Sequence, residues 1–161
     1  MTARTAVPLL FLAIALPALA QQKSAVDYPT GYRKWAHVKS MAIVSDKHPL
    51  FGAFGGIHHV YVNPVGFDAL VKGKSFPDGS VLIFDLLEAK EDNGAWVEGD
   101  RKLLAVMQKD RARWKTTGGW GFEAFKGDSH TEQTVTDANA QCFGCHQGQP
   151  KNDFVFSVFR P

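Results

Sequence analysis

The chain has 161 residues, 45% of them hydrophobic, and its 18 lysines and arginines nearly balance 16 aspartates and glutamates. A formal net charge of +2 without a basic stripe argues against a nucleic-acid partner. This length is enough for one domain with a real hydrophobic core, and no internal repeat or low-complexity segment divides it.

The N-terminus has the pattern of a secretory signal peptide over residues 1–20. A positively charged start precedes an apolar run at residues 6–16, and Ala18-Leu19-Ala20 matches an A-x-A cleavage site. The apolar run is too short to span a membrane, which takes about 20 residues. We therefore expect an exported, periplasmic protein without stable membrane insertion, with a flexible leader over residues 21–26 and a single domain over residues 27–161.

Period-two alternation of apolar residues dominates the rest of the chain and predicts strands more often than helices. Proline suits a first helical turn and glycine suits a helix end, so Pro64 and Gly73 frame one short helix. Pro77-Asp78-Gly79 and Asp92-Asn93-Gly94 predict turns on either side of a strand. Asp85 on this strand has no obvious partner and is expected at a solvated edge. In chain order the predicted elements are a short helix at 29–35, strands at 38–44 and 57–62, a helix at 64–71, strands at 80–89, 102–108 and 120–125, a helix from Thr136 or Asp137 to Gly148 or Pro150, and a segment at 154–159 that pairs onto the sheet.

The last predicted helix contains Cys142-Phe143-Gly144-Cys145-His146, a C-x-x-C-H run that is the attachment signature of a c-type haem. Positions i, i+3 and i+4 lie on one face of a helix. Cys142 and Cys145 are then placed to form thioethers to the two vinyl groups, while His146 offers its imidazole to the iron. The chain has no other cysteine, and an exported location agrees with haem attachment. A structural disulfide between the two cysteines is the alternative.

The position of this motif, near the end of a chain rich in strand signals, argues against the familiar helical cytochromes. Small c-type electron carriers are largely helical, and ordinary cytochromes c′ are four-helix bundles. We therefore predict an α+β fold, with a predominantly antiparallel β-sheet and a few short helices. The C-terminal helix carries the C-x-x-C-H motif, and the haem packs against the sheet.

Several further short motifs occur in a specific order and spacing along the chain. They are Tyr32-Arg33-Lys34-Trp35, Val60-Tyr61-Val62-Asn63-Pro64, Phe76-Pro77-Asp78-Gly79-Ser80-Val81 and Asp153-Phe154-Val155-Phe156. Together with C-x-x-C-H, this arrangement resembles the cytochrome P460 family, which includes the cytochromes c′-beta. The resemblance covers nearly all of the chain after the predicted signal peptide, and it implies one covalently attached haem c and a homodimer.

The resemblance also implies which residues lie over the distal side of the haem. The P460 enzymes carry a lysine bonded to the haem, and the matching position here is Phe84. Their distal carboxylate corresponds to Ala105, and an arginine of their pocket corresponds to His58. Two phenylalanines cap the distal pocket of the cytochromes c′-beta, and Phe54 matches the second of them, with Phe51 as the competitor. These replacements favour the c′-beta branch.

An apolar cap and a single proximal ligand predict a five-coordinate haem that binds nitric oxide, and also carbon monoxide, for scavenging, transport or sensing. The chain would then be a gas-binding protein rather than an enzyme, with a redox protein as a further partner. One alternative is a six-coordinate electron carrier; its candidate ligands are Met41, Met107, His37, His48, His58, His59 and His130. The other alternative is a hydroxylamine or nitric oxide oxidoreductase, which needs the cross-linking lysine.

Overall fold

The structure is a computed structural model that describes residues 26–161; the predicted signal peptide and residues 21–25 lie outside this range. Val26 was expected in the flexible leader, but its side chain is buried in the core, so the packed domain includes it. No helix among residues 26–161 is long and apolar enough to cross a membrane.

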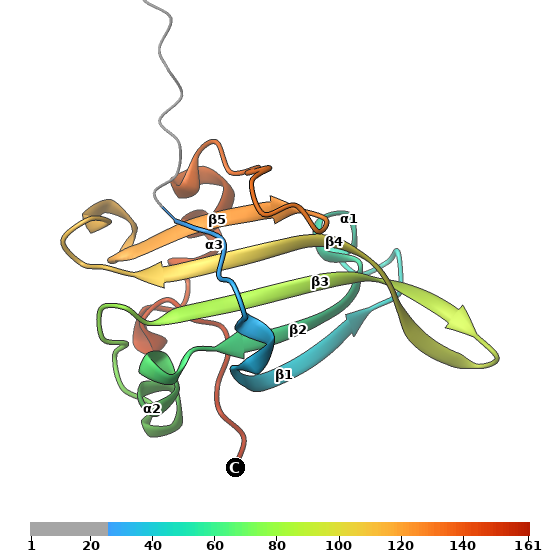
Figure 1. The fold of residues 1–161 in the computed structure, drawn as a ribbon, viewed down its shortest axis with the longest axis horizontal. Helices are drawn as coiled ribbons and strands as arrows, with labels where there is room; N and C mark the ends of the chain where they lie inside the picture. The colour runs from blue at the N-terminus through green and yellow to red at the C-terminus, as the bar shows by residue number, and fades with distance from the viewer. Residues whose placement is uncertain (1–25) are drawn as a thin grey trace, which may run out of the picture.

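A five-stranded antiparallel sheet forms the centre of the domain, with the strands in the order β1-β2-β3-β4-β5 (Figure 1). The predicted fold class is therefore confirmed. The elements are η1 (Tyr32–Lys34), β1 (Ala36–Ile43), α1 (Phe51–Phe54), β2 (Gly56–Val62), α2 (Pro64–Lys72), β3 (Val81–Asp92), β4 (Ala95–Lys109), η2 (Lys115–Thr117), β5 (Trp120–Lys126), η3 (Asn139–Phe143), α3 (Gly144–His146) and η4 (Pro150–Asn152).

The hairpin between β3 and β4 extends beyond the other strands (Figure 1). Asn93 and Gly94 form its two-residue turn, and both have a positive φ, of 50° and 82°. A two-residue turn of this kind matches the right-handed twist of the strands it joins. The predicted strand at 102–108 is too short, because β4 already begins at Ala95. The outer half of β4 is mostly exposed on both faces, so it lacks the alternation that indicates a strand.

Helix α2 begins and ends where the sequence predicts. The Asn63 side chain accepts a hydrogen bond from the Gly66 backbone N–H, Pro64 occupies the first turn, and Gly73 adopts the left-handed conformation after the last turn. The Asn63 side chain also accepts a hydrogen bond from the Val81 backbone N–H at 3.0 Å. This second bond ties the start of α2 to the first residue of β3.

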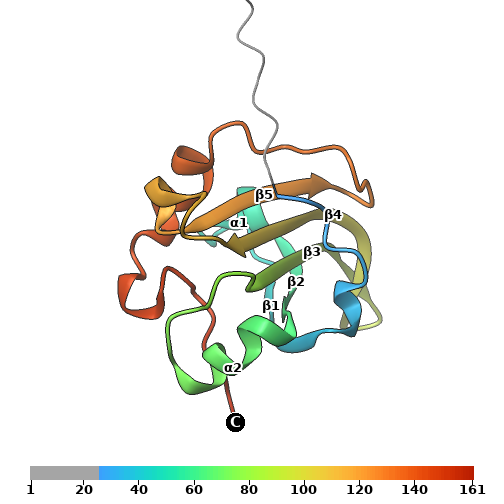
Figure 2. The same ribbon diagram turned by 60° about the vertical axis from the view of Figure 1, so that its left-hand side comes forward.

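The two faces of the sheet are covered by opposite ends of the chain (Figures 1 and 2). On one face, the C-terminal segments and α2 pack on strand residues that include Val62, Leu82 and Phe122; we name it the C-terminal face. On the other face, the first described residues pack on strand residues that include Ile83 and Val106; we name it the N-terminal face. Directly paired residues of neighbouring strands point to the same face, so the strand register assigns every side chain to one of them.

Residues 154–159 do not form the predicted strand. Phe154 has a φ of 66°, which is incompatible with an extended ladder. The Val155 and Ser157 carbonyls accept hydrogen bonds from the Asn152 side chain instead of from a neighbouring strand. The aromatic side chains serve packing instead. Phe159 meets Phe67 of α2 with ring centroids 5.8 Å apart, where the C-terminal segment runs beside that helix (Figure 2).

Asp85 is fully buried on the N-terminal face, so the predicted solvated position is wrong. Its carboxylate accepts hydrogen bonds from the Tyr32 hydroxyl at 2.6 Å and the Arg101 Nε at 2.6 Å, and Arg33 approaches it at 3.3 Å. These partners come from segments far from Asp85 in the sequence. Since a buried charge is tolerated only with such partners, the network fixes β3 against β4 and η1.

We expect Arg101→Met to lower the free energy of unfolding by about 3 kcal/mol, because the Asp85 carboxylate would stay buried with a weaker set of partners. Urea unfolding at pH 7 measures this loss. The matched control is Lys72→Met, which breaks the exposed ion pair with Asp68 and should cost less than about 1 kcal/mol. Equal losses in the two variants would show that the buried network contributes no more to stability than an exposed ion pair.

Candidate functional site

The C-x-x-C-H motif lies on a helical segment, as the sequence predicts, but the segment is not a regular α-helix. Residues 139–143 form a turn of π-helix, and only Gly144–His146 are α-helical. Asp137 is the capping residue, because its side chain accepts hydrogen bonds from the next two free backbone N–H groups, at residues 139 and 140. The Gln141 side chain in turn accepts from the Asp137 N–H at 2.8 Å. This reciprocal cap fixes where the helical segment begins.

His146 is prepared to bind a metal through one ring nitrogen. Its Nδ1 lies 2.8 Å from the Phe154 carbonyl oxygen, which has no proton to donate, so Nδ1 carries the proton. The lone pair of the neutral ring is then on Nε2, the nitrogen that metals bind. Burial lowers the pKa of His146, against an opposing contribution from the Phe154 bond, and therefore favours the neutral ring.

The two cysteines are free thiols, so the alternative of a disulfide between them is not what the structure shows. Cys142 is half-buried among the residues of the C-terminal face, and Cys145 is exposed. Burial raises the pKa of Cys142 to about 11, with a further contribution from the Glu123 carboxylate. Cys142 is therefore a protonated thiol at pH 7, and Cys145 is the more accessible of the two sulfurs.

The strand residues next to this segment leave an apolar surface on the C-terminal face. Phe122 of β5 contacts His146, with ring centroids 5.1 Å apart. Phe122 pairs with Met107 of β4. Two pairs further along these strands, on the same face, Ala105 lies directly opposite Ala124, and both are only half-buried. The next strand inward places Phe84 opposite Ala105, again half-buried. We name Ala124, Ala105 and Phe84 the apolar row. Its two methyl groups lie at the β5 end and are small enough for a flat group to lie against the sheet there.

Two phenylalanines meet at the far side of this row. Phe54 of α1 and Phe84 of β3 make an edge-to-face contact with ring centroids 5.4 Å apart. Such pairs add about 0.5–1.5 kcal/mol to the burial of the rings. Phe51 lies instead in a separate surface cavity, which Trp96 and Lys102 also line. The structure therefore places Phe54, and not Phe51, against Phe84.

His58 lies beside this aromatic pair and is almost completely buried, with 3% of its surface exposed. Its ring stacks on Phe84 with centroids 4.3 Å apart, and its Nδ1 has no hydrogen-bond partner. Burial lowers the pKa of His58 to about 4, with smaller contributions from the charges of Lys39 and His59. His58 is thus a neutral polar group at the edge of the apolar row.

The lowered pKa predicts an acid-dependent loss of stability. Between pH 6.5, the ordinary value, and about 4, the unfolded chain binds more protons than the folded one, so stability falls as the pH drops. The loss from this one group reaches about 3 kcal/mol. His58→Gln should remove this part of the pH dependence, measured by urea unfolding at pH 7, 5.5 and 4. The exposed His48→Gln is the control, and an unchanged slope in His58→Gln would contradict the assignment.

The other candidate sixth ligands lie elsewhere, with one exception. Met107 is half-buried on the C-terminal face, directly opposite Phe122. His59 points to the opposite face from His58, as strand alternation predicts, and its ring bonds to Ser40 and Glu98. The remaining histidines and Met41 are occupied or exposed: His37 bonds to Ser40, His48 accepts from the Leu50 N–H, His130 stacks on Tyr28, and Met41 is 44% exposed.

The features that sequence reasoning missed are mostly backbone groups and small side chains. The Phe154 carbonyl, which orients His146, carries no sequence signal, because every residue has a carbonyl. Ala124 could have been found from the strand register, since it pairs with the predicted pocket residue Ala105. Phe122 lies in a predicted strand, two residues after Trp120 and therefore on the same face of the sheet.

The residues present fit a haem, on the geometry just described. His146, whose Nδ1 is bonded to the Phe154 carbonyl, follows two thiols at the haem-attachment spacing, and the apolar row with its two small alanines adjoins it. The described part of the chain contains no cluster of three histidine, cysteine or acidic side chains that would hold a bare metal ion. The fold and site therefore define a haem-binding protein built on an antiparallel sheet.

Comparison with known protein families agrees with this class of protein and identifies the family. The family model described as Cytochrome P460 matches residues 29–157, and the chain belongs to that family of haem-binding cytochromes. The match includes every strand, α2 and the whole C-x-x-C-H segment. No curated protein matches the chain in sequence.

Proposed function

We propose that this protein is an exported mono-haem cytochrome of the c′-beta branch that binds nitric oxide, and also carbon monoxide, at a five-coordinate haem. The Phe54–Phe84 pair carries this proposal, because it occupies the side of the apolar row away from His146. Cys142 and Cys145 would hold haem c covalently, and His146 would be the proximal iron ligand. The role is then scavenging, transport or sensing of a gas rather than catalysis.

When bound, haem supplies an iron atom with an open position for a diatomic gas. The side chains of this protein decide what reaches that position. The rings of Phe54 and Phe84 exclude water and offer no hydrogen bond, which disfavours dioxygen because its bound form needs such a bond. Nitric oxide and carbon monoxide need it much less. His58, which stacks on Phe84, is a polar group beside the cap, and its burial keeps it uncharged at pH 7.

Absorption spectra of the mature protein test this proposal. The protein is expressed with haem maturation, its ferric and dithionite-reduced spectra are recorded, and nitric oxide is added. A high-spin ferrous haem with an ordinary c-type Soret band that takes up nitric oxide is the expected result. A strongly red-shifted Soret band would indicate a cross-linked haem and overturn the proposal in favour of the oxidoreductase, for which Phe84 lacks the required amine.

A six-coordinate electron carrier is the second candidate, and one observation favours it. His58 and Met107 both lie on the C-terminal face, and the buried Nδ1 of His58 has no partner. A low-spin reduced spectrum with sharp α and β bands would support this candidate. Loss of those bands in His58→Gln or in Met107→Leu would then identify the ligand.

Three further properties extend the proposal. Residues 1–20 would direct export to the periplasm, where haem attachment takes place. A redox protein would serve as partner if the haem iron must be reduced before it binds gas. A homodimer is favoured by β1, which among residues 26–161 pairs only with β2 and so leaves one strand edge open for pairing.

A further inference from the structure

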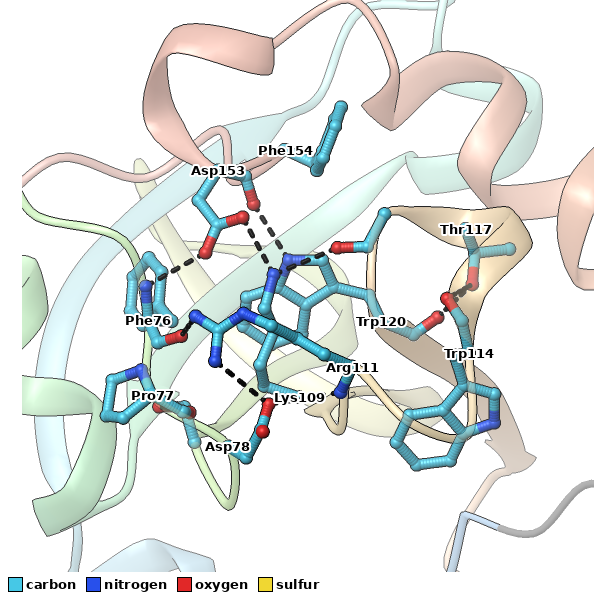
Figure 3. Close-up of polar contacts among 12 residues, drawn as sticks. Phe76, Pro77, Asp78, Lys109, Arg111, Trp114, Thr117, Trp120, Asp153 and Phe154 are labelled. Carbon is cyan, nitrogen blue, oxygen red and sulfur yellow. Dashed lines mark hydrogen bonds and ion pairs between the residues drawn. The ribbon is translucent and has the colours of Figure 1, made fainter.

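A buried ion pair lies under the loop that follows the C-x-x-C-H segment. The side chain of Lys109, the last residue of β4, is 2% exposed, and its Nζ donates to an Asp153 carboxylate oxygen at 2.7 Å (Figure 3). The same Nζ donates to the Gly118 carbonyl at 2.9 Å and lies 4.8 Å from the centroid of the Trp120 ring. A lysine this deeply buried persists only with such a full set of partners.

Asp153 makes hydrogen bonds to three segments that are distant in the sequence. Its second carboxylate oxygen accepts a hydrogen bond from the Phe76 backbone N–H at 2.8 Å, and its main-chain carbonyl accepts from the Trp120 indole N–H at 2.8 Å (Figure 3). With the Lys109 bond, three contacts from the 73–80 loop, β4 and β5 converge on one residue. This convergence fixes the position of the loop relative to the sheet.

The loop is strained at the point where it is held. Asp153 and Phe154 are consecutive residues with φ of 49° and 66°, in the left-handed region that non-glycine residues seldom adopt. Each such residue costs about 1–2 kcal/mol, and the conformation persists only where surrounding contacts impose it. The Phe154 ring also packs directly on Gly118. The contact is so close that a Cβ at position 118 would lie 2.3 Å from the ring.

The strained turn determines the direction of the Phe154 carbonyl group. Phe154 in the left-handed conformation turns its carbonyl oxygen to His146, 2.8 Å from Nδ1. A carbonyl on this nitrogen fixes the ring orientation and makes the other nitrogen a stronger metal ligand. The Lys109 ion pair lies one residue away from that carbonyl in the chain.

We propose that the buried Lys109–Asp153 ion pair is the positioning device for the axial histidine, acting through the strained Asp153-Phe154 turn. The pair holds the Phe154 carbonyl on His146 Nδ1 and thereby sets the basicity of Nε2. Lys109 and Asp153 are positioning residues, since neither touches the haem side of His146. The inference rests on the proposed function in one respect, that His146 is the proximal ligand.

Resonance Raman spectroscopy of the ferrous, haem-loaded protein tests the inference, because the iron–histidine stretch reports the strength of the Nδ1 hydrogen bond. In Lys109→Met and Asp153→Ala, we expect this stretch to shift to lower frequency and the reduction potential to rise. Asp153→Asn should give a smaller shift of the same sign. Asparagine keeps an acceptor for the Phe76 N–H and tolerates a positive φ, but it removes the charge.

Lys126→Met is the matched control, because it breaks an exposed ion pair, with Glu132, by the same substitution. It should leave both the stretch and the potential at their wild-type values. Unchanged values in folded, haem-loaded Asp153→Ala and Lys109→Met would overturn the inference and leave the pair a purely stabilising role. If these two variants fail to fold, an unchanged stretch and potential in Asp153→Asn would overturn the inference in the same way. A wild-type protein without an iron–histidine band would instead reject His146 as the ligand, and with it the proposed function.

Discussion

Replacing both cysteines, in the double variant Cys142→Ala, Cys145→Ala, is expected to abolish covalent haem attachment completely. The two thiols are free, three residues apart, and followed directly by the only histidine of the C-terminal segment. Thioether formation has no other sulfur nucleophile in the chain, because no further cysteine exists. Acid–acetone extraction measures the result: haem should stay with the wild-type protein and pass into the solvent with the double variant.

The single variants make this test specific. Cys142→Ala and Cys145→Ala should each retain one thioether and therefore keep haem through extraction, with the α band of the pyridine haemochrome shifted. His146→Ala should retain both thioethers but lose the spectrum of a histidine-ligated haem. Extractable haem in the wild-type protein would contradict covalent attachment, although a non-covalent haem on the C-terminal face would remain compatible with membership of the family.

The strand pattern allowed the face of the sheet on which many side chains lie to be predicted. Alternation along β3 set Phe84 and Ile83 on opposite faces, and the structure buries Ile83 in the N-terminal core while Phe84 contacts Phe54 on the C-terminal face. The same rule separated His58 from His59. Local patterns suffice in these cases, because the two faces of the sheet are covered by different segments and each side chain must match its own face.

Features that depend on contacts between distant segments could not be predicted in this way. Asp85 reads as a solvated charge, because its partners Tyr32 and Arg101 lie 53 and 16 residues away in the sequence. Likewise, the segment at 154–159 alternates like a strand. It nevertheless begins with a left-handed turn at Asp153 and Phe154, and Asp153 binds Lys109, 44 residues earlier. Propensity is a weak signal wherever tertiary contacts of this kind override it.

The π-helical turn at 139–143 is a further case. The helical position of the motif followed from the cysteine spacing, but the insertion of a wider turn did not, since no residue type specifies it. Asp137 and Gln141 cap one another across this turn, and they set where the helix begins. The site geometry therefore comes from a local capping signal combined with long-range packing on Phe122.

Removing one ring of the cap, in Phe84→Ala, is expected to speed the binding of carbon monoxide and nitric oxide. An incoming ligand must part the edge-to-face contact between Phe84 and Phe54, and losing a contact of up to about 1.5 kcal/mol lowers the barrier enough for a rate increase of about tenfold. Flash photolysis of the carbon monoxide complex measures the association rate. Thermal unfolding run in parallel separates this effect from a general loss of structure.

Phe51→Ala is the matched control for the cap. Phe51 belongs to the same short helix as Phe54 and is equally exposed, at 37% of its surface, but it lines the surface cavity beside Trp96 and Lys102 instead of contacting Phe84. Its removal should therefore leave the association rate unchanged, whereas Phe54→Ala should raise the rate as Phe84→Ala does. Because Phe54 and Phe84 form one contact, the double variant should bind little faster than either single variant. Additive effects, or an unchanged rate in Phe84→Ala, would mean that the two rings do not guard the gas-binding side.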